Sequence, residues 1–176
     1  IYVKMGGTAS KDDLAEFLGN TPSSSSFVKK VSILRAYGLL TGEGSTFILS
    51  DLAHRIVAPS SKADEAKAKV EAFRKIEVFA RVHDMYKGKI CPEEVYLANT
   101  IEREAGVPSE SKVAWAKAFL EAVQAAGLYL AQGGKVVIRS DAPVIESVPV
   151  EISSQQEKEM DATGNKATEA IAREER

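Results

Sequence analysis

The fold is decided by residues 10–50, which read SKDDLAEFLGNTPSSSSFVKKVSILRAYGLLTGEGSTFILS. Ser10 is followed three residues later by the acidic Asp13, and this spacing is typical of the first turn of a helix. Apolar residues follow at helical spacing as far as Gly19. Because glycine readily adopts the left-handed conformation that follows helices, Gly19 predicts the end of this one.

A second helix is expected over residues 23–37, where apolar side chains recur at helical spacing. These side chains are Phe27, Val31 and Leu34. Gly38 predicts the end of the helix, and residues 39–49 predict a β-hairpin around a glycine-containing turn. Residues 50–57 predict one more short helix before Pro59. Helix, tight turn, helix and hairpin is the order of a winged helix-turn-helix module.

The same order recurs further along the chain. We expect a long amphipathic helix over residues 69–86 and another helix whose first residue is Pro92. A third helix is expected over residues 109–126, with Val113 among its core positions, and a second hairpin over residues 129–138.

The two halves also match at short motifs. Pro22-Ser23 corresponds to Pro108-Ser109, and Gly38-Leu39 corresponds to Gly127-Leu128. The sequence therefore predicts a mainly α-helical chain with small β-hairpins, built from tandem winged helix-turn-helix modules. Three segments are expected: the first module over residues 1–59, the second over residues 60–140, and an acidic, flexible tail over residues 141–176.

The beginning of the chain fits this repeat. Residues 2–7 resemble the end of a helix, as residues 85–88 do. We therefore expect most of the first module's opening helix to lie before Ile1, which would make the chain a fragment of a longer protein.

Two motifs carry a family resemblance. They are LRAYGLL at residues 34–40 and LSDLAHRI at residues 49–56, separated by the glycine-containing turn. With them, residues 10–59 resemble the winged-helix modules of prokaryotic and phage proteins. Residues 69–140 resemble these modules in outline only. The resemblance implies a fold and carries no activity with it, because one fold serves many functions.

Composition limits the function classes. No apolar run approaches the ~18 residues of a membrane span, and the single cysteine, Cys91, excludes an internal disulfide framework. Residues 1–140 contain slightly more basic than acidic residues, whereas residues 141–176 contain 4 basic and 9 acidic residues. The expected location is the cytoplasm or nucleoid of a prokaryote.

Double-stranded DNA is the first candidate partner, and a regulatory or architectural role would follow from it. In helix-turn-helix proteins the second helix enters the major groove, while hydroxyls, lysines and helix N-termini contact phosphates. Fourteen residues are candidates for this contact: Thr21, Ser23, Ser24, Ser25, Ser26, Lys29, Lys30, Ser32, Ser109, Ser111, Lys112, Lys117, Lys135 and Arg139. The competing interpretation is that the serines form a turn and that Lys29 and Lys30 lie on an ordinary solvated face.

A protein-interaction or dimerisation scaffold is the alternative function. Small residues allow close approach of another helix, and the third helix of the second module has four of them at suitable spacing: Ala114, Ala118, Ala122 and Ala125. This surface would pack on a second copy of the chain, giving a homodimer, or on the first module.

The sequence offers little that resembles a catalytic motif. His54 and His83 have no second histidine or cysteine at metal-ligand spacing, and both are interpreted as structural or surface residues. Gly42 and Gly44 fall at a hairpin tip and do not form a nucleotide-binding fingerprint. The sequence predicts no enzyme activity, no cofactor and no metal, and no small-molecule ligand is evident from it.

Overall fold

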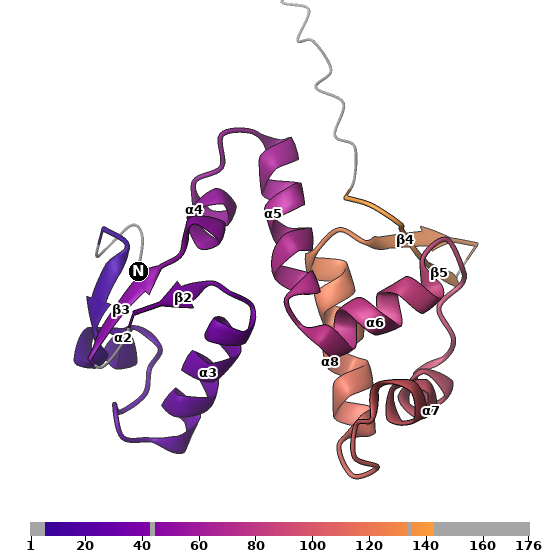
Figure 1. The fold of residues 1–176 in the computed structure, drawn as a ribbon, viewed down its shortest axis with the longest axis horizontal. Helices are drawn as coiled ribbons and strands as arrows, with labels where there is room; N and C mark the ends of the chain where they lie inside the picture. Colours follow the sequence, from indigo (N-terminus) through magenta and orange to yellow (C-terminus); the bar gives the residue numbers. More distant parts are fainter. Residues whose placement is uncertain (1–5, 43–44, 134, 143–176) are drawn as a thin grey trace, which may run out of the picture. The chain divides into compact units, whose positions relative to one another are not determined.

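The computed structural model of the chain describes residues 6–42, 45–133 and 135–142. Its elements in chain order are β1 (Thr8–Ser10), α2 (Lys11–Phe17), α3 (Ser25–Ala36), β2 (Leu40–Thr41), β3 (Thr46–Leu49), α4 (Asp51–Val57), α5 (Lys62–Arg74), α6 (Glu77–Tyr86), α7 (Glu94–Ala105), α8 (Lys112–Ala125), β4 (Tyr129–Gln132) and β5 (Lys135–Ile138) (Figure 1). The expected mainly helical chain with small antiparallel β-hairpins is confirmed. The tail expected from residue 141 lies outside the described residues from residue 143 on.

Serine side chains begin several of the helices. The predicted capping box at Ser10 is confirmed, because its side chain accepts a hydrogen bond from the Asp13 N–H and the Asp13 carboxylate accepts one from the Ser10 N–H. Ser24, Ser50 and Ser61 are the N-caps of α3, α4 and α5, where each side chain accepts a hydrogen bond from a backbone N–H without the reciprocal bond. Each cap satisfies a backbone N–H that has no partner within the helix, and such caps contribute about 1 kcal/mol each.

The first half contains a three-stranded antiparallel sheet in the order β1-β3-β2. The hairpin of β2 and β3 is the predicted one, whereas β1 is not predicted by the sequence pattern. In β1, Thr8 pairs with Ile48 of β3, and just before it the Gly7 carbonyl accepts a hydrogen bond of 2.8 Å from the Leu49 N–H. Three residues are too few to show the alternation that marks a strand. The helix end expected over residues 2–7 lies mostly outside the described residues.

The single long helix predicted over residues 69–86 is wrong, because α5 and α6 are separate helices with Lys75 and Ile76 between them. Apolar residues spaced three apart rotate by about 60° around a helix at each step, since the helix turns once per 3.6 residues. One straight helix would spread this stripe around its circumference. The break allows Phe73 and Phe79 to stack in one core, with their ring centroids 5.6 Å apart.

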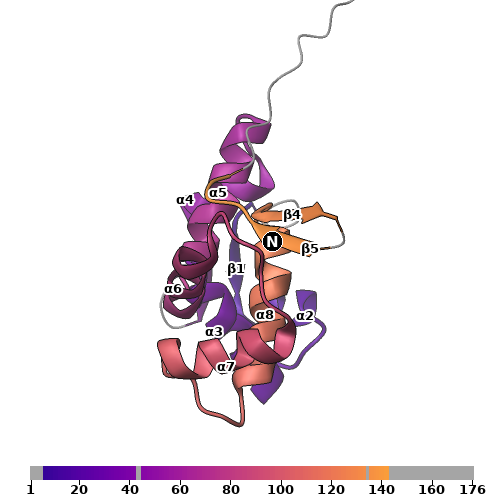
Figure 2. The same cartoon turned by 90° about the vertical axis from the view of Figure 1, so that its right-hand side faces the viewer.

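The second half is built on α6, α7, α8 and the β4-β5 hairpin. Helix α7 packs against α8 (Figure 2), and Phe119 and Leu128 are fully buried in the core that these elements share. Val113 is 47% exposed, so its assignment to the core is wrong. It lies in the first turn of α8, at the edge of the core, whereas Ala116 and Phe119 in the next turn point inward.

The same backbone hydrogen bond closes both halves. In the first half the Ser50 N–H donates to the Leu39 carbonyl at 3.1 Å, and in the second the Arg139 N–H donates to the Leu128 carbonyl at 2.8 Å. Each acceptor is the first residue after a helix and its glycine stop. The two halves therefore join the end of a helix to the end of a hairpin through the same contact.

Two glycines occupy equivalent positions in the two halves and align them. Gly38 and Gly127 have φ angles of 70° and 71°, a conformation that glycine adopts without steric cost. The first extended segments correspond as well, because the antiparallel bridge of Ile90 with Val137 takes the place of the β1–β3 pairing. Both halves thus share one order of extended segment, two helices and a hairpin.

Two smaller apolar clusters complete the core. Leu14, Phe27 and Phe47 are buried in the first half, where the Phe27 and Phe47 rings meet edge to face. Leu52 of α4 packs against Ala68 of α5 in a cluster of its own. No helix in the described part of the chain is both long and apolar enough to cross a membrane.

Candidate nucleic-acid interface

The serine run leads into α3 and has two different roles. Ser24 is the N-cap: its hydroxyl accepts from the Phe27 N–H at 3.2 Å and donates to the Thr21 carbonyl at 2.8 Å. Thr21, Ser23, Ser25 and Ser26 are exposed around this first turn. The interpretation of the run as a capped turn is therefore right for Ser24, and its neighbours keep hydroxyls that face solvent.

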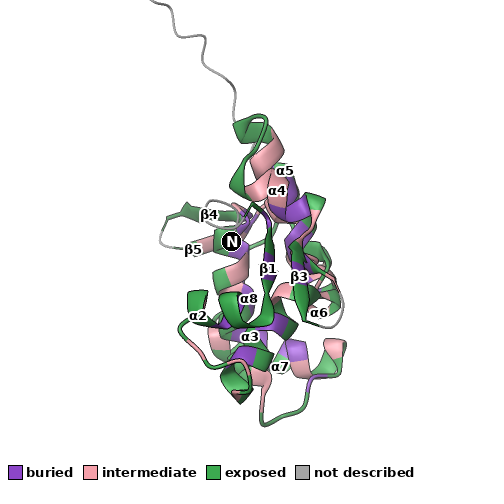
Figure 3. Ribbon diagram, turned by 90° about the vertical axis from the view of Figure 1, so that its left-hand side faces the viewer, coloured by how far each residue is buried: buried purple, intermediate pink, exposed green. Residues whose placement is uncertain are grey.

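The exposed side of α3 carries lysine and serine side chains beside the apolar Val28, Ile33 and Ala36. Phe27 and Val31 are buried, whereas Ser25, Lys29 and Ser32 are exposed, as expected from their spacing. The ribbon of α3 accordingly shows both buried and exposed stretches (Figure 3). Helix α3 contains no acidic residue, and no salt bridge within the described residues involves Lys29. Its positive charge is therefore not offset by a directly paired carboxylate.

Lys30 has a structural contact. Its ammonium group donates to the Leu18 carbonyl at 2.9 Å, at the C-terminal end of α2. A cation there satisfies an otherwise unpaired carbonyl and interacts favourably with the helix dipole. Of the two candidate lysines, Lys29 thus has the freer side chain.

Arg35 is a candidate that the sequence analysis missed. Its guanidinium donates to the Gly42 carbonyl at 3.0 Å and lies 5.3 Å from the centroid of the Phe47 ring. It therefore connects the last turn of α3 to the turn and strand of the β2-β3 hairpin. The sequence does show a basic residue three positions after Ser32, on an adjoining face of the helix. It does not show that the partners of Arg35 lie outside this helix.

The candidate residues at the start of α8 are paired with acids. Lys112 donates to Glu102 at 2.5 Å and to Asn99 at 2.9 Å, and Ser109 also donates to Glu102. The hydrogen bond from Lys112, followed by that from Ser109, lowers the pKa of Glu102. The charge of Lys112 is thus largely offset within the molecule.

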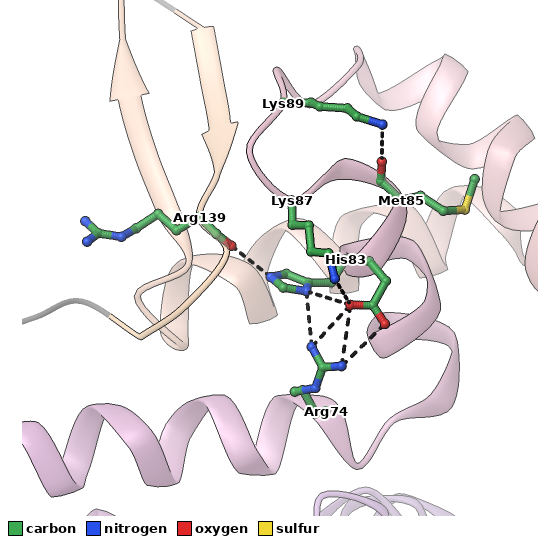
Figure 4. Close-up of polar contacts among 7 residues, drawn as sticks. Arg74, His83, Met85, Lys87, Lys89 and Arg139 are labelled. Carbon is green, nitrogen blue, oxygen red and sulfur yellow. Dashed lines mark hydrogen bonds and ion pairs between the residues drawn. The ribbon is translucent and has the colours of Figure 1, made fainter.

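The remaining candidates of the second half are scattered. The Ser111 hydroxyl donates to the Pro108 carbonyl at 3.1 Å, and Lys117 lies 3.9 Å from Glu94. Lys135 is exposed beside the turn of the β4-β5 hairpin, and the Arg139 side chain points away from the nearby imidazole of His83 (Figure 4). These residues do not form a group comparable with the exposed serines and lysines of α3.

Alanines take the corresponding places on α8. Ala114 and Ala118 stand the same number of residues before Gly127 as Ser25 and Lys29 stand before Gly38. Ala114, Ala118 and Ala125 are exposed and Ala122 is partly exposed, so the four predicted interface residues are accessible. All four border apolar hollows whose other walls include Ile33 of α3 and Tyr37, the C-cap of that helix.

The buried His83 is the centre of a polar cluster whose other side chains are partly exposed (Figure 4). Its Nε2 lies 2.8 Å from the Arg139 carbonyl, and its Nδ1 lies 3.4 Å from the Arg74 guanidinium. Asp84 joins Arg74 and Lys87 at 3.4 and 3.2 Å. The hydrogen bond from Lys87 is the main cause that lowers the pKa of Asp84, and the charges of Arg74 and Lys87 act in the same direction. The cluster ties α5, α6 and the end of β5 together, as a structural histidine would.

The cysteine offers no site for chemistry. Burial raises the pKa of the Cys91 thiol to about 11, which keeps it protonated. Pro92 is not the first residue of α7 as predicted, because α7 begins at Glu94 with Glu93 as its N-cap. The extended backbone around Cys91, whose N–H donates to the Val136 carbonyl at 2.7 Å, delays the helix start. The described residues hold no group of three or more His, Cys, Asp or Glu side chains placed to bind a metal.

The geometry thus distinguishes the exposed serines and lysines of α3 from the small, apolar face of α8. Compared with known protein families, with curated proteins and with solved structures, the chain matches none.

Proposed function

We propose that the chain is a tandem winged helix-turn-helix protein that binds double-stranded DNA through α3. The winged-helix assignment is supported by the order of extended segment, two helices and hairpin in each half, with the first segment paired to the last strand. In this arrangement α3 is the recognition helix of the first module, and the β2-β3 turn is its wing.

The observation that carries DNA binding is the exposed face of Ser25, Lys29 and Ser32, which has no acidic residue on its helix. Small hydroxyls allow the helix to approach the base edges, and the lysine neutralises a phosphate. The N-terminal turn of α3 adds exposed hydroxyls and the positive end of the helix dipole, which also favours a phosphate. Arg35 joins α3 to the wing through Gly42 and Phe47.

The second module has a different role in this proposal. The lysines near its α8 are engaged by Glu102 and Glu94, and alanines occupy the places of Ser25 and Lys29. We therefore assign direct DNA contact to the first module alone, in a regulatory or architectural protein without catalytic function. A packing or dimerisation role of the second module is the competing function, and the exposed alanines favour it.

Fluorescence anisotropy of a fluorescein-labelled duplex, measured over a salt series from about 50 mM, tests DNA binding. Wild-type chain should bind with an affinity that falls linearly on a log–log plot against salt. Lys29→Glu should weaken binding at least tenfold at low salt and reduce the slope by about one unit or more, since it removes one phosphate contact.

Lys117→Glu on α8 is the matched control, because it reverses the same charge on an exposed helical lysine. It should leave the affinity within about twofold. Absence of binding at about 50 mM salt, or equal losses in the two variants, would overturn the assignment of DNA contact to α3 and favour the interaction scaffold.

A further inference from the structure

An apolar hollow lies between α3, the start of α6 and α8. Its volume is about 360 Å³, within the range of ~300–1,000 Å³ typical of small-molecule sites. The lining residues are Ile33, Ala36, Tyr37, Ile76, Phe79, Ser111, Ala114, Trp115 and Ala118. None of them is charged, so the walls offer no counter-charge to an ionic occupant.

Three aromatic rings form one side of this hollow in a fixed arrangement. The Phe79 and Trp115 rings meet edge to face with centroids 5.7 Å apart, and Tyr37 lies 6.5 Å from Phe79. Phe79 is buried, which holds the group in place from behind. Such rings favour an aromatic guest, which can stack on one ring and meet the edge of another.

Small and exposed apolar residues form the remaining walls. Ala114 and Ala118 leave room where larger side chains would fill the space. Ile33 is 56% exposed, although it borders the hollow. An occupant would therefore remove substantial apolar surface from water, which stabilises a complex by roughly 25 cal/mol per Å² before the costs of association.

Polar groups at the wall are few. The Ser111 hydroxyl already donates to the Pro108 carbonyl. Burial, and secondarily the nearby Glu121 carboxylate, raises the pKa of the Tyr37 hydroxyl, so this group stays protonated at neutral pH. It has no hydrogen-bond partner among the hydrogen bonds of the described residues and can donate to a ligand. An anionic ligand, by contrast, would lose its hydration without compensation.

We propose that this hollow is a binding site for a neutral aromatic small molecule that carries one hydrogen-bond acceptor. The site does not include Ser25, Lys29 or Ser32, but Ile33 and Ala36 of its wall belong to the same helix α3. It gives the alanines of α8 a specific role, which is to provide space for the ligand.

The chain contains a built-in reporter, because Trp115 is its single tryptophan and borders the hollow. The probe is 6-propionyl-2-dimethylaminonaphthalene, a neutral aromatic ketone that absorbs tryptophan emission and changes colour with polarity. Titrating it into the intact chain should quench Trp115 emission to saturation and shift the probe emission to the blue. Naphthalene-2-sulfonate, an anion of similar ring size, should bind at least tenfold more weakly.

Three variants locate the binding. Ala118→Leu places a larger side chain in the hollow and should weaken probe binding at least tenfold. Ala63→Leu, at another exposed helical alanine, should leave it unchanged. Tyr37→Phe removes only the hydroxyl and should weaken binding of the ketone several-fold. Circular dichroism of each variant should match that of the wild type, which shows that the losses do not reflect unfolding.

Several results would overturn the proposal. They are the lack of saturable quenching, equal binding by the wild type and Ala118→Leu, and equal affinity for the sulfonate. Sedimentation velocity adds a fourth. If the wild type is a dimer that Ala118→Leu converts to a monomer, a second copy of the chain covers this surface and the small-molecule assignment is wrong. The proposed DNA binding is measured with a different probe and stands or falls separately.

Discussion

The Nε2 atom of His83 on α6 lies 2.8 Å from the carbonyl oxygen of Arg139, just beyond β5. A carbonyl oxygen only accepts hydrogen bonds, so Nε2 carries the proton in this contact. The His83 side chain is fully buried. The bond therefore satisfies the Arg139 carbonyl from a fully buried side chain, and it joins two elements far apart in the sequence.

Replacing His83 by leucine should destabilise the second half. The Arg139 carbonyl would lose its donor in this partly buried contact, and an acceptor left unpaired there costs up to about 1–3 kcal/mol. Urea denaturation followed by circular dichroism would measure the loss in the free energy of unfolding. A loss below about 0.5 kcal/mol would show that water or another donor readily replaces the imidazole at this position.

Replacing Arg35 by methionine should lower the free energy of unfolding by about 1 kcal/mol. The change removes an exposed hydrogen bond to the Gly42 carbonyl and a contact with the Phe47 ring, each worth about 0.5–1 kcal/mol. Arg103→Met is the control, since within the described part of the chain the Arg103 guanidinium bonds only to the adjacent, exposed Glu104. Equal effects in the two variants would contradict a link between α3 and the hairpin.

The stability of the chain should fall in acid partly through Glu102. Hydrogen bonds from Lys112 and then Ser109 lower its pKa in the folded state, so the unfolded state binds the proton more readily. Glu102 therefore contributes stability above its unfolded pKa of about 4.3, and this contribution is lost as the pH falls through the lower, folded pKa.

Lys112→Met should reduce this part of the acid sensitivity. Urea denaturation at pH 7 and at about pH 3 would show a smaller difference in the variant than in the wild type. A difference of the same size would mean that the pairing of Glu102 with Lys112 does not persist in solution.

The Cys91 thiol should react slowly while the chain is folded. It is buried, its pKa is raised to about 11, and only the thiolate is a strong nucleophile. Reaction with a chromogenic aromatic disulfide at pH 8 should be at least tenfold slower than in urea, where the thiol has its ordinary pKa of about 8.5. Because Cys91 is the single cysteine, the absorbance reports this site alone. Equal rates would show that this part of the core opens freely.

The features of the fold that depend on neighbouring residues alone could be predicted from the sequence. The capping box of Ser10 and Asp13 depends on neighbouring residues alone, and the exposed face of Ser25 and Lys29 follows from helical periodicity. Gly38 likewise marks the end of α3 with its positive φ angle. These features need no knowledge of the remaining fold.

The features that were missed depend on distant partners. Strand β1 exists through its pairing with β3, and the break before α6 exists because Phe73 and Phe79 share a core. The contacts of Arg35 and the engagement of Lys112 by Glu102 require the tertiary arrangement. Periodicity indicates which face of a helix is exposed, but it does not indicate what the exposed side chains meet.

Because Ser25 and Lys29 align with Ala114 and Ala118, helices α3 and α8 can each carry either pair of side chains. Transplanting serine and lysine onto α8, as Ala114→Ser with Ala118→Lys, would recreate the polar pair on a second backbone and fill the hollow in the same operation. On our two proposals, the side chains at these aligned positions determine whether a helix binds DNA or a neutral aromatic ligand, and they do not serve both. The difference in function between the two halves then depends on two side chains rather than on a difference in fold.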